Sequence, residues 1–197
     1  MTTVRQIERL WKDKTYDRLF AELTAARPEG TLSLRMDVAQ PLPAAAVAMI
    51  RLDELNQAHV PLYASLVRTI LAAQDSDGGW GDLITTAFCL RALLCSNGNG
   101  PSIDRGLEFL SQLQKSDGLW PNVPIRRMPA DAYVSALILY ELGDQPRFRD
   151  AVRFAAAVEW FARHESELDD ECRRLWDRLR VRCRWAARAT EPVLNFS

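Results

Sequence analysis

The sequence predicts an all-α protein built from stacked antiparallel helix pairs, and three observations support this. Apolar residues recur at three- and four-residue spacing over most of the 197 residues, a pattern typical of amphipathic helices. Glycine and proline gather in short clusters between these stretches. Two segments, AAQDSDGGWGD (72–82) and SQLQKSDGLWP (111–121), share one pattern 40 positions apart. A fixed period of this size is typical of repeat proteins, in which stacked units bury a continuous core.

The spacing of apolar residues predicts roughly eight helices and no strand. In chain order the helices are expected over residues 3–26, 43–56, 60–74, 83–95, 102–114, 130–142, about 146–164 and about 166–189. The first begins with an apolar stripe of Val4, Ile7 and Leu10 and ends before RPEG. Pro43 opens the second, because proline is favoured in the first turn of a helix. Residues 31–42 are expected to form a short turn or an extended segment.

Turn-forming residues define the later boundaries. The SNGNGPS stretch predicts the end of the fourth helix, with Gly98 or Gly100 in the left-handed conformation and Ser102 capping the next helix. The GDQP stretch ends the sixth helix at Gly143, and Asp144 is expected to cap the seventh. We therefore expect one domain over residues 1–197, with the repeats between about residues 43 and 143.

The repeated loops contain residues suited to a structural role. The matched positions are Gln74, Asp77, Gly78 and Trp80 in the first copy and Gln114, Asp117, Gly118 and Trp120 in the second. Glycine permits a turn with positive φ, and aspartate can accept hydrogen bonds from the N–H groups of that turn. A buried indole N–H needs one acceptor. The motif is predicted to hold a helix end against its neighbour rather than to carry chemistry.

The segments QDSDGGWG and QKSDGLWP resemble the Gln–Trp repeats of squalene–hopene and oxidosqualene cyclases and the related repeats of protein prenyltransferase β-subunits. The resemblance covers about residues 43–143. It implies an α/α toroid, with inner and outer rings of helices around an apolar cavity. This chain has room for fewer helix pairs than those toroids use. We therefore expect a shortened ring, an open arc, or half of a ring that a partner closes.

The resemblance also implies where a cyclase would hold its acid. The Asp-x-Asp-Asp-Thr-Ala motif of the cyclases matches DLITTA, residues 82–87, in which Ile84 and Thr85 replace two acids. Because Ile84 stands where the proton donor would be, no alkene-protonating cyclisation is expected by that route. The acidic LDDECRRLWD stretch lacks the spacing for a magnesium cluster, and His59 and His164 do not suit a zinc site. No metal and no cofactor are expected.

A few residues remain candidates for chemistry or ligand binding. Asp131 heads an apolar helix at the position taken as equivalent to Thr86, which makes the second loop about five residues longer than the first. It is either a buried acid with a raised pKa or a helix N-cap. Arg126 and Arg127 either hold an anionic substrate or pair with Asp131. The candidate ligand-binding residues are Arg126, Arg127, Tyr133 and Phe88.

Composition and charge exclude several other classes of protein. The net charge of −1 predicts no general attraction to nucleic acid, and no apolar run is long enough to span a membrane. The amphipathic N-terminal stretch does not resemble a secretory signal. Four cysteines fit no zinc spacing, so reduced thiols and a cytoplasmic location are expected. They are Cys89, Cys95, Cys172 and Cys183.

The last predicted helix contains seven arginines and one aspartate between residues 173 and 188. Leu175, Leu179 and Cys183 form an apolar stripe that should face the body of the protein. The exposed arginines either form a solvated face or dock an anionic partner. Those expected to be exposed include Arg178, Arg182 and Arg188.

Two functions remain open. The first is a protein of the cyclase type that holds an isoprenoid or a similar polyene or polyketide on its concave face. The second is a non-catalytic repeat scaffold that binds a partner protein through its helix ends and the arginine-rich C-terminal helix. A homo-oligomer is compatible with either. A deep aromatic pocket with a buried acid would favour the first function, and a filled concave face would favour the second.

Overall fold

The computed structural model describes residues 3–25, 40–96 and 100–189, with side chains as far as Cys183. Within these ranges the chain forms ten α-helices, one 3-10 helix and no strand, which confirms the predicted all-α class. In chain order the elements are α1 (Val4–Lys12), α2 (Tyr16–Ala25), α3 (Pro41–Glu54), α4 (Pro61–Ala72), α5 (Leu83–Cys95), α6 (Pro101–Leu113), α7 (Ala132–Leu142), α8 (Pro146–Ala151), α9 (Phe154–Arg163), the 3-10 helix η1 (Glu165–Glu167) and α10 (Asp170–Ala189).

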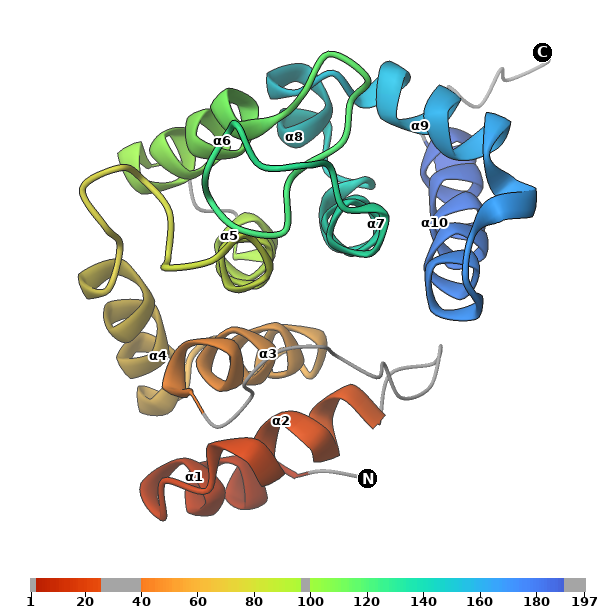
Figure 1. The fold of residues 1–197 in the computed structure, drawn as a ribbon. Coiled ribbons are helices and arrows are strands. Elements are labelled where there is room, and N and C mark those ends of the chain that lie inside the picture. Colours follow the sequence, from red (N-terminus) through yellow and green to blue (C-terminus); the bar gives the residue numbers. More distant parts are fainter. Residues whose placement is uncertain (1–2, 26–39, 97–99, 190–197) are drawn as a thin grey trace, which may run out of the picture.

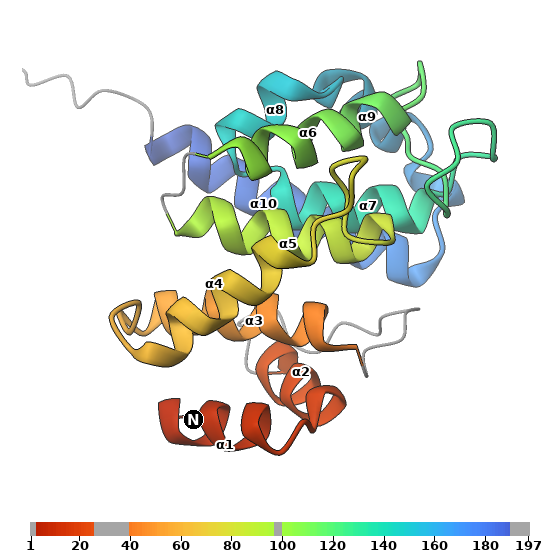
Figure 2. The ribbon, with the colours of Figure 1, turned by 90° about the vertical axis from the view of Figure 1, so that its left-hand side faces the viewer.

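The helices form two layers (Figures 1 and 2). An inner row runs α3, α5, α7, α10, and each of these helices contacts the next. In the outer layer, α4 packs on α3, α6 packs on α5, and α8 packs against α6. Helices α1 and α2 cover the first end of the row, where α2 packs on α3. The predicted antiparallel pairs therefore correspond to an inner and an outer helix of each repeat.

The inner helices are apolar around nearly their whole circumference. Residues 83–90 of α5 and residues 133–142 of α7 are all buried, as are residues 43–50 of α3. A helix that is hydrophobic on all sides belongs in a protein core. The inner helices α3, α5 and α7 therefore form the core of the protein.

The predicted N-terminal helix over residues 3–26 is wrong, because the chain forms two helices there. Lys14 has a φ of 55°, in the left-handed region, and it ends α1. The Thr15 N–H donates to the Leu10 carbonyl at 3.1 Å, and the Lys14 N–H donates to the Trp11 carbonyl at 3.1 Å. These two bonds form a Schellman motif, which normally carries glycine. With lysine in that position, the sequence contains no recognisable stop signal.

The predicted helix over residues 146–164 is also divided. Val152 is extended, with φ −121° and ψ 168°, and separates α8 from α9. The next predicted helix begins at Asp170 rather than at residue 166, because Asp169 Oδ1 accepts the Cys172 N–H at 2.8 Å and caps it. A 3-10 turn, η1, fills the interval.

At the starts of α6 and α8, the N-cap is a residue close to the predicted one. Gly100, with a φ of −164°, is the N-cap of α6, and Pro101 takes the first helical position in place of Ser102. Gly98 lies outside the described residues, as do residues 31–39 of the predicted turn. Asp144 does not cap α8. Gln145 is the N-cap but makes no side-chain capping hydrogen bond, and Asp144 pairs with arginines instead.

Candidate functional site

The two Gln–Trp loops make the same indole contacts. Trp80 Nε1 donates to the Ile70 carbonyl at 2.7 Å, and Trp120 Nε1 donates to the Leu110 carbonyl at 2.8 Å. In each case the acceptor lies ten residues earlier, near the end of the preceding outer helix. Both tryptophans are fully buried. The indole therefore fastens each loop to the helix that leads into it.

The glutamine of each loop connects it to the following outer helix. Gln74 Nε2 donates to the Gly78 and Ser102 carbonyls, both at 2.8 Å. Gln114 Nε2 donates to the Gly118 carbonyl at 2.8 Å, and Gln114 Oε1 accepts the Arg153 N–H at 2.7 Å. Ser102 is in the first turn of α6, and Arg153 is the N-cap of α9. Each glutamine thus fixes the start of the next repeat.

Two glycines allow this close approach. Gly78 has a φ of 95° and Gly118 a φ of 88°. A Cβ on Gly78 would lie 2.5 Å from the Arg105 carbonyl oxygen, and one on Gly118 would lie 2.3 Å from the Ala157 nitrogen. Both the conformation and the space therefore require glycine. Asp77 and Asp117 each accept one N–H of their turn, at 2.9 and 3.1 Å.

In the structure Asp131 is equivalent to Asp82. The prediction from the two repeats, which matched Asp131 with Thr86, is wrong. Asp82 Oδ1 accepts the Thr85 N–H at 2.8 Å, and Asp131 Oδ1 accepts the Val134 N–H at 2.9 Å. Both aspartates are therefore N-caps of inner helices. The two caps are 49 positions apart in a 40-residue repeat, so the second loop is nine residues longer, not five.

A second pair of equivalent residues fixes this register. The Trp80 N–H donates to Thr86 Oγ1 at 2.9 Å, and the Trp120 N–H donates to Ser135 Oγ at 2.8 Å. Each hydroxyl residue follows its capping aspartate by four positions. This Asp-x-x-x-Ser/Thr spacing is the sequence signal that the alignment on Thr-Ala missed.

None of the four candidate ligand residues lines the cavity beside the first loop or the groove between α6 and α8. Phe88 is fully buried in α5, with its ring 5.5 Å from that of Phe20 in α2. Tyr133 is buried in the first turn of α7. Arg126 and Arg127 are exposed in the second loop, and the described residues show no ion pair between either of them and Asp131. Phe88 is thus a core residue, whereas both arginines are exposed in the second loop.

A cavity of about 370 Å³ lies beside the first loop. It is lined by Gln40, Leu42, Pro43, Ala73, Asp75, Trp80, Gly81, Asp82 and Thr85. Its carboxylates already accept hydrogen bonds: Asp75 Oδ2 from the Gly81 N–H at 2.8 Å, and Asp82 Oδ2 from the Thr85 hydroxyl at 2.7 Å. The lining comes from the start of α3, the end of α4, the loop and the first turn of α5. Nothing in the sequence indicates that these segments lie around one cavity.

The nine additional residues of the second loop form a defined structure. A bridge between Pro121 and Ala130 closes its base. At its tip the Met128 N–H donates to the Ile125 carbonyl at 2.9 Å, which places Arg126 and Arg127 at the corner of a turn. Figure 2 shows this loop extending beyond the end of α7. The longer loop is therefore a folded projection with two arginines at its tip.

Four cations and one apolar side chain gather around this projection, and we call them the basic loop. They are Ile125, Arg126, Arg127, Lys115 and Arg153. Lys115 Nζ donates to the Arg126 carbonyl at 3.0 Å, and an Arg153 guanidinium nitrogen donates to the Lys115 carbonyl at 3.0 Å. Ile125 is 45% exposed. No ion pair in the described part of the chain involves any of the four cations.

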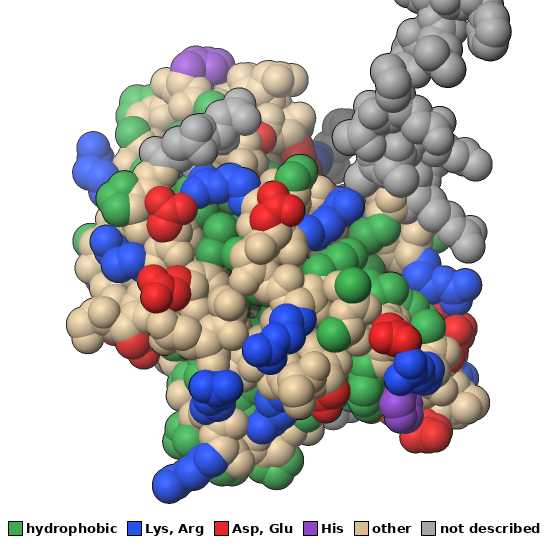
Figure 3. All heavy atoms as spheres, turned by 90° about the horizontal axis from the view of Figure 1, so that it is seen from above, with side chains coloured by type: hydrophobic (Ala, Val, Ile, Leu, Met, Phe, Trp, Pro, Cys, Tyr) green, Lys and Arg blue, Asp and Glu red, His purple; other side chains and the backbone are tan. Residues whose placement is uncertain are grey.

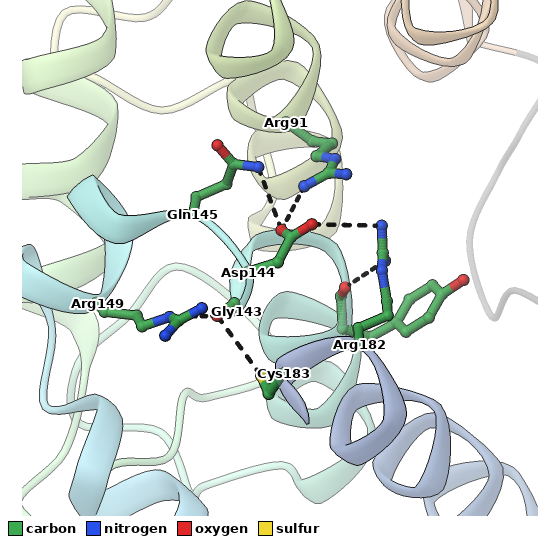
Figure 4. A network of polar contacts seen from close by, with 8 residues as sticks. Arg91, Gly143, Asp144, Gln145, Arg149, Arg182 and Cys183 are labelled. Carbon is green, nitrogen blue, oxygen red and sulfur yellow. Dashed lines mark hydrogen bonds and ion pairs between the residues drawn. The ribbon is translucent and has the colours of Figure 1, made fainter. Parts of the chain in front are cut away.

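A second polar cluster joins the C-terminal helix to the body (Figure 4). Arg182 donates to the Tyr140 carbonyl at 2.8 Å, lies 4.8 Å from the Tyr140 ring centre and lies 3.8 Å from Asp144 Oδ2. Arg91 of α5 pairs with the same carboxylate. Burial acts to lower the pKa of Arg91, but the adjacent Asp144 and its hydrogen bond leave that pKa raised.

The arginines of α10 are therefore not all available to a partner. Arg182 is a structural residue, which corrects the expectation that it is exposed for docking. Arg178 is half-buried, and the side chain of Arg188 lies outside the described residues. The predicted stripe does face the body, because Leu175 and Leu179 are buried and Cys183 is half-buried.

The four cysteines are free. Burial, with the Asp82 charge adding to it, raises the pKa of the Cys89 thiol well above its ordinary value. Burial also raises the pKa of the Cys95 and Cys183 thiols. A thiol that stays protonated is a poor nucleophile. Over the described residues, no group of three or more His, Cys, Asp or Glu is placed to hold a metal ion.

The comparisons with known proteins add no family to this geometry. No family model matches the chain, and neither the curated proteins nor the solved structures contain a match. No helix in the described ranges combines the length and the apolar character needed to cross a membrane.

Proposed function

We propose that this protein is a non-catalytic repeat scaffold that binds a partner protein. The burial of the inner helices is the observation that carries the proposal, because nearly all residues of α5 and α7 are removed from solvent. The residues expected to line a concave ligand site, Phe88 and Tyr133, are buried in packing contacts. The two Gln–Trp loops share one set of contacts, which is compatible with the shortened α/α-toroid repeats that the sequence resembles. A scaffold needs this architecture and no catalytic acid.

Native mass spectrometry of the full chain purified from its own host tests this function. The scaffold predicts a complex whose additional mass is a second polypeptide, and which dissociates on collisional activation to the unmodified chain. Only the free chain, or the chain with a retained small molecule, would contradict it. The same chain produced in an unrelated host serves as the control, because it lacks the specific partner.

A second function, binding of an apolar isoprenoid- or polyketide-like molecule, is favoured by the cavity beside the first loop. Its volume of about 370 Å³ lies within the range of roughly 300–1,000 Å³ seen for ligand pockets. Leu42, Pro43 and Trp80 give it apolar walls. Cyclase-type chemistry there would use Asp75 or Asp82, since Ile84 has no proton to donate.

Calorimetric titration with farnesol tests the second function. Saturable binding that is lost in Ala73→Phe, which fills the cavity, would support it. The control is Ala155→Phe, at an exposed position of α9. Absence of binding to the unmodified chain would leave the scaffold as the better proposal.

A further inference from the structure

The geometry points to the basic loop as the docking site for an acidic segment of the partner protein. This inference rests on the proposed scaffold function and names the chemistry of its partner. Insertions in repeat proteins occur in loops on one face, which is often the binding face. The nine-residue extension is such an insertion, and the first repeat has no counterpart of it.

The basic loop is ordered before any partner arrives. The Pro121–Ala130 bridge, the turn from Ile125 to Met128 and the Lys115 bond to the Arg126 carbonyl hold its backbone. A surface that is already ordered loses less conformational entropy on binding than a flexible one. The loop is therefore suited to present its side chains in a fixed arrangement.

The side chains of the basic loop match carboxylates and one apolar pocket. Arg126 and Arg127 are exposed and adjacent at a turn, and a guanidinium binds a carboxylate through two parallel hydrogen bonds. Ile125 is one of the few large apolar side chains that are well exposed in the described residues. Its removal from water on binding would add affinity, while the arginines add orientation and speed of association.

The charge around the basic loop favours a short acidic protein segment over a long polyanion. The net charge of the chain is −1. Figure 3, which looks onto α6, α8 and α9, shows Lys and Arg side chains interspersed with Asp and Glu rather than one continuous basic field. Asp104, Glu108 and Asp150 line the groove between α6 and α8 in this layer. A nucleic acid or an anionic membrane would meet these acids, whereas a segment with a few carboxylates would not.

Photo-crosslinking in the host tests this docking site. The full chain carries p-benzoylphenylalanine at position 125, and the crosslinked peptide is sequenced. We expect a peptide of another protein that contains at least two Asp or Glu residues near the crosslink. We also expect the Arg126→Gln/Arg127→Gln double variant to lower the yield at least tenfold. The matched control is Arg5→Gln/Arg68→Gln, which removes two exposed arginines elsewhere and should leave the yield unchanged.

Other results would overturn the docking site. The absence of any crosslink at position 125 would do so, as would a crosslink to nucleic acid, to lipid or to a second copy of this chain. A crosslinked peptide without Asp or Glu, or an unchanged crosslink yield in the double variant, would also rule the site out. Failure of the scaffold function is seen separately. If native mass spectrometry still shows the partner bound to the Arg126→Gln/Arg127→Gln variant, the scaffold stands and the docking site is elsewhere. If no partner is bound to any variant, both proposals fail.

Discussion

Asp82 and Asp131 occupy the same position in successive repeats, and each caps an inner helix through Oδ1 and the N–H three residues on. The equivalence gives Asp131 a structural task that accounts for its presence. It also identifies the nine residues before it as the difference between the repeats. Both the assignment of Asp131 and the definition of the basic loop depend on this relationship.

If Asp131 acts as a cap, its replacement should affect stability in a graded way. Asp131→Ala should lower the free energy of unfolding by about 0.5–2 kcal/mol, because alanine cannot accept the Val134 N–H. Asp131→Asn keeps an acceptor and should stay close to the unmodified protein. Chemical denaturation measures both. Equal losses in the two variants would show that the negative charge, and not the cap, is what matters.

The buried indoles predict large losses of stability. Trp80→Ala and Trp120→Ala should each lower the free energy of unfolding by about 3–5 kcal/mol, the usual range for such core truncations. Trp160→Ala, at a partly exposed position of α9, is the comparison and should cost less. Denaturant titration followed by circular dichroism gives the values. A small effect at either buried site would refute the role of the indole in fastening the loop.

Gly118→Ala should destabilise the protein by at least about 1 kcal/mol. The new Cβ would meet the backbone of Ala157, and the φ of 88° is unfavourable for alanine. Gly100→Ala is a matched control, because its Cβ would meet nothing within 4 Å and its φ is −164°. Thermal unfolding of the two variants should therefore differ clearly in midpoint. The same midpoint for both would mean that α9 moves away at no cost.

Loss of Arg182 should loosen the C-terminal helix. Arg182→Gln removes the bond to the Tyr140 carbonyl and the contact with Asp144, and we expect a cost of about 1–3 kcal/mol. Arg174→Gln, on the exposed side of the same helix, should change stability by less than about 0.5 kcal/mol. Amide hydrogen exchange should show faster exchange in α10 for the first variant alone. Unchanged exchange there would show that the apolar stripe suffices to hold α10.

Stability should fall at alkaline pH because of the buried thiols. Burial raises the pKa of Cys89 in the folded state, while an unfolded cysteine ionises near about 8.5. The unfolded state therefore loses its thiol proton first, so the contribution is complete below that pH and declines above it. Denaturation between pH 7 and pH 10.5 should show the decline, and Cys89→Ala should make it less steep. A decline of the same slope in the variant would assign the effect to other groups.

Apolar periodicity was enough to predict the helical class, and the 40-residue register was enough to predict paired helices and a structural role for both Gln–Trp loops. The carbonyl groups that accept the indole N–H bonds, those of Ile70 and Leu110, were not predicted.

The missed features depend on positions where local preference and structure disagree. Lys14 and Asn56 adopt the left-handed conformation in which glycine is usual. Because Lys14 stands where glycine would be expected, the sequence contains no helix-terminating residue at the end of α1. Arg182 was read as exposed because its partners, Tyr140 and Asp144, are about 40 residues away along the chain.

The candidate site was predicted only in part. Arg126 and Arg127 were named as candidates for binding an anionic substrate, but their grouping with Lys115 and Arg153 required the fold, since Arg153 is the N-cap of α9. Phe88 was named as a ligand-binding residue, but it lies in α5, which is apolar throughout. An apolar helix has no polar side from which its orientation can be read, and the ring in fact packs against α2.

The glutamine contacts have a consequence for how the protein is made. Gln74 cannot complete its hydrogen bonds until Ser102 has left the ribosome, 28 residues later, and Gln114 must wait 39 residues for Arg153. Each unit of the nascent chain therefore emerges with its loop incomplete and is finished by the unit behind it. We therefore expect the repeats to be completed in order from the amino terminus. A chain arrested between Ser102 and Arg153 should have the contacts of Gln74 complete and those of Gln114 incomplete.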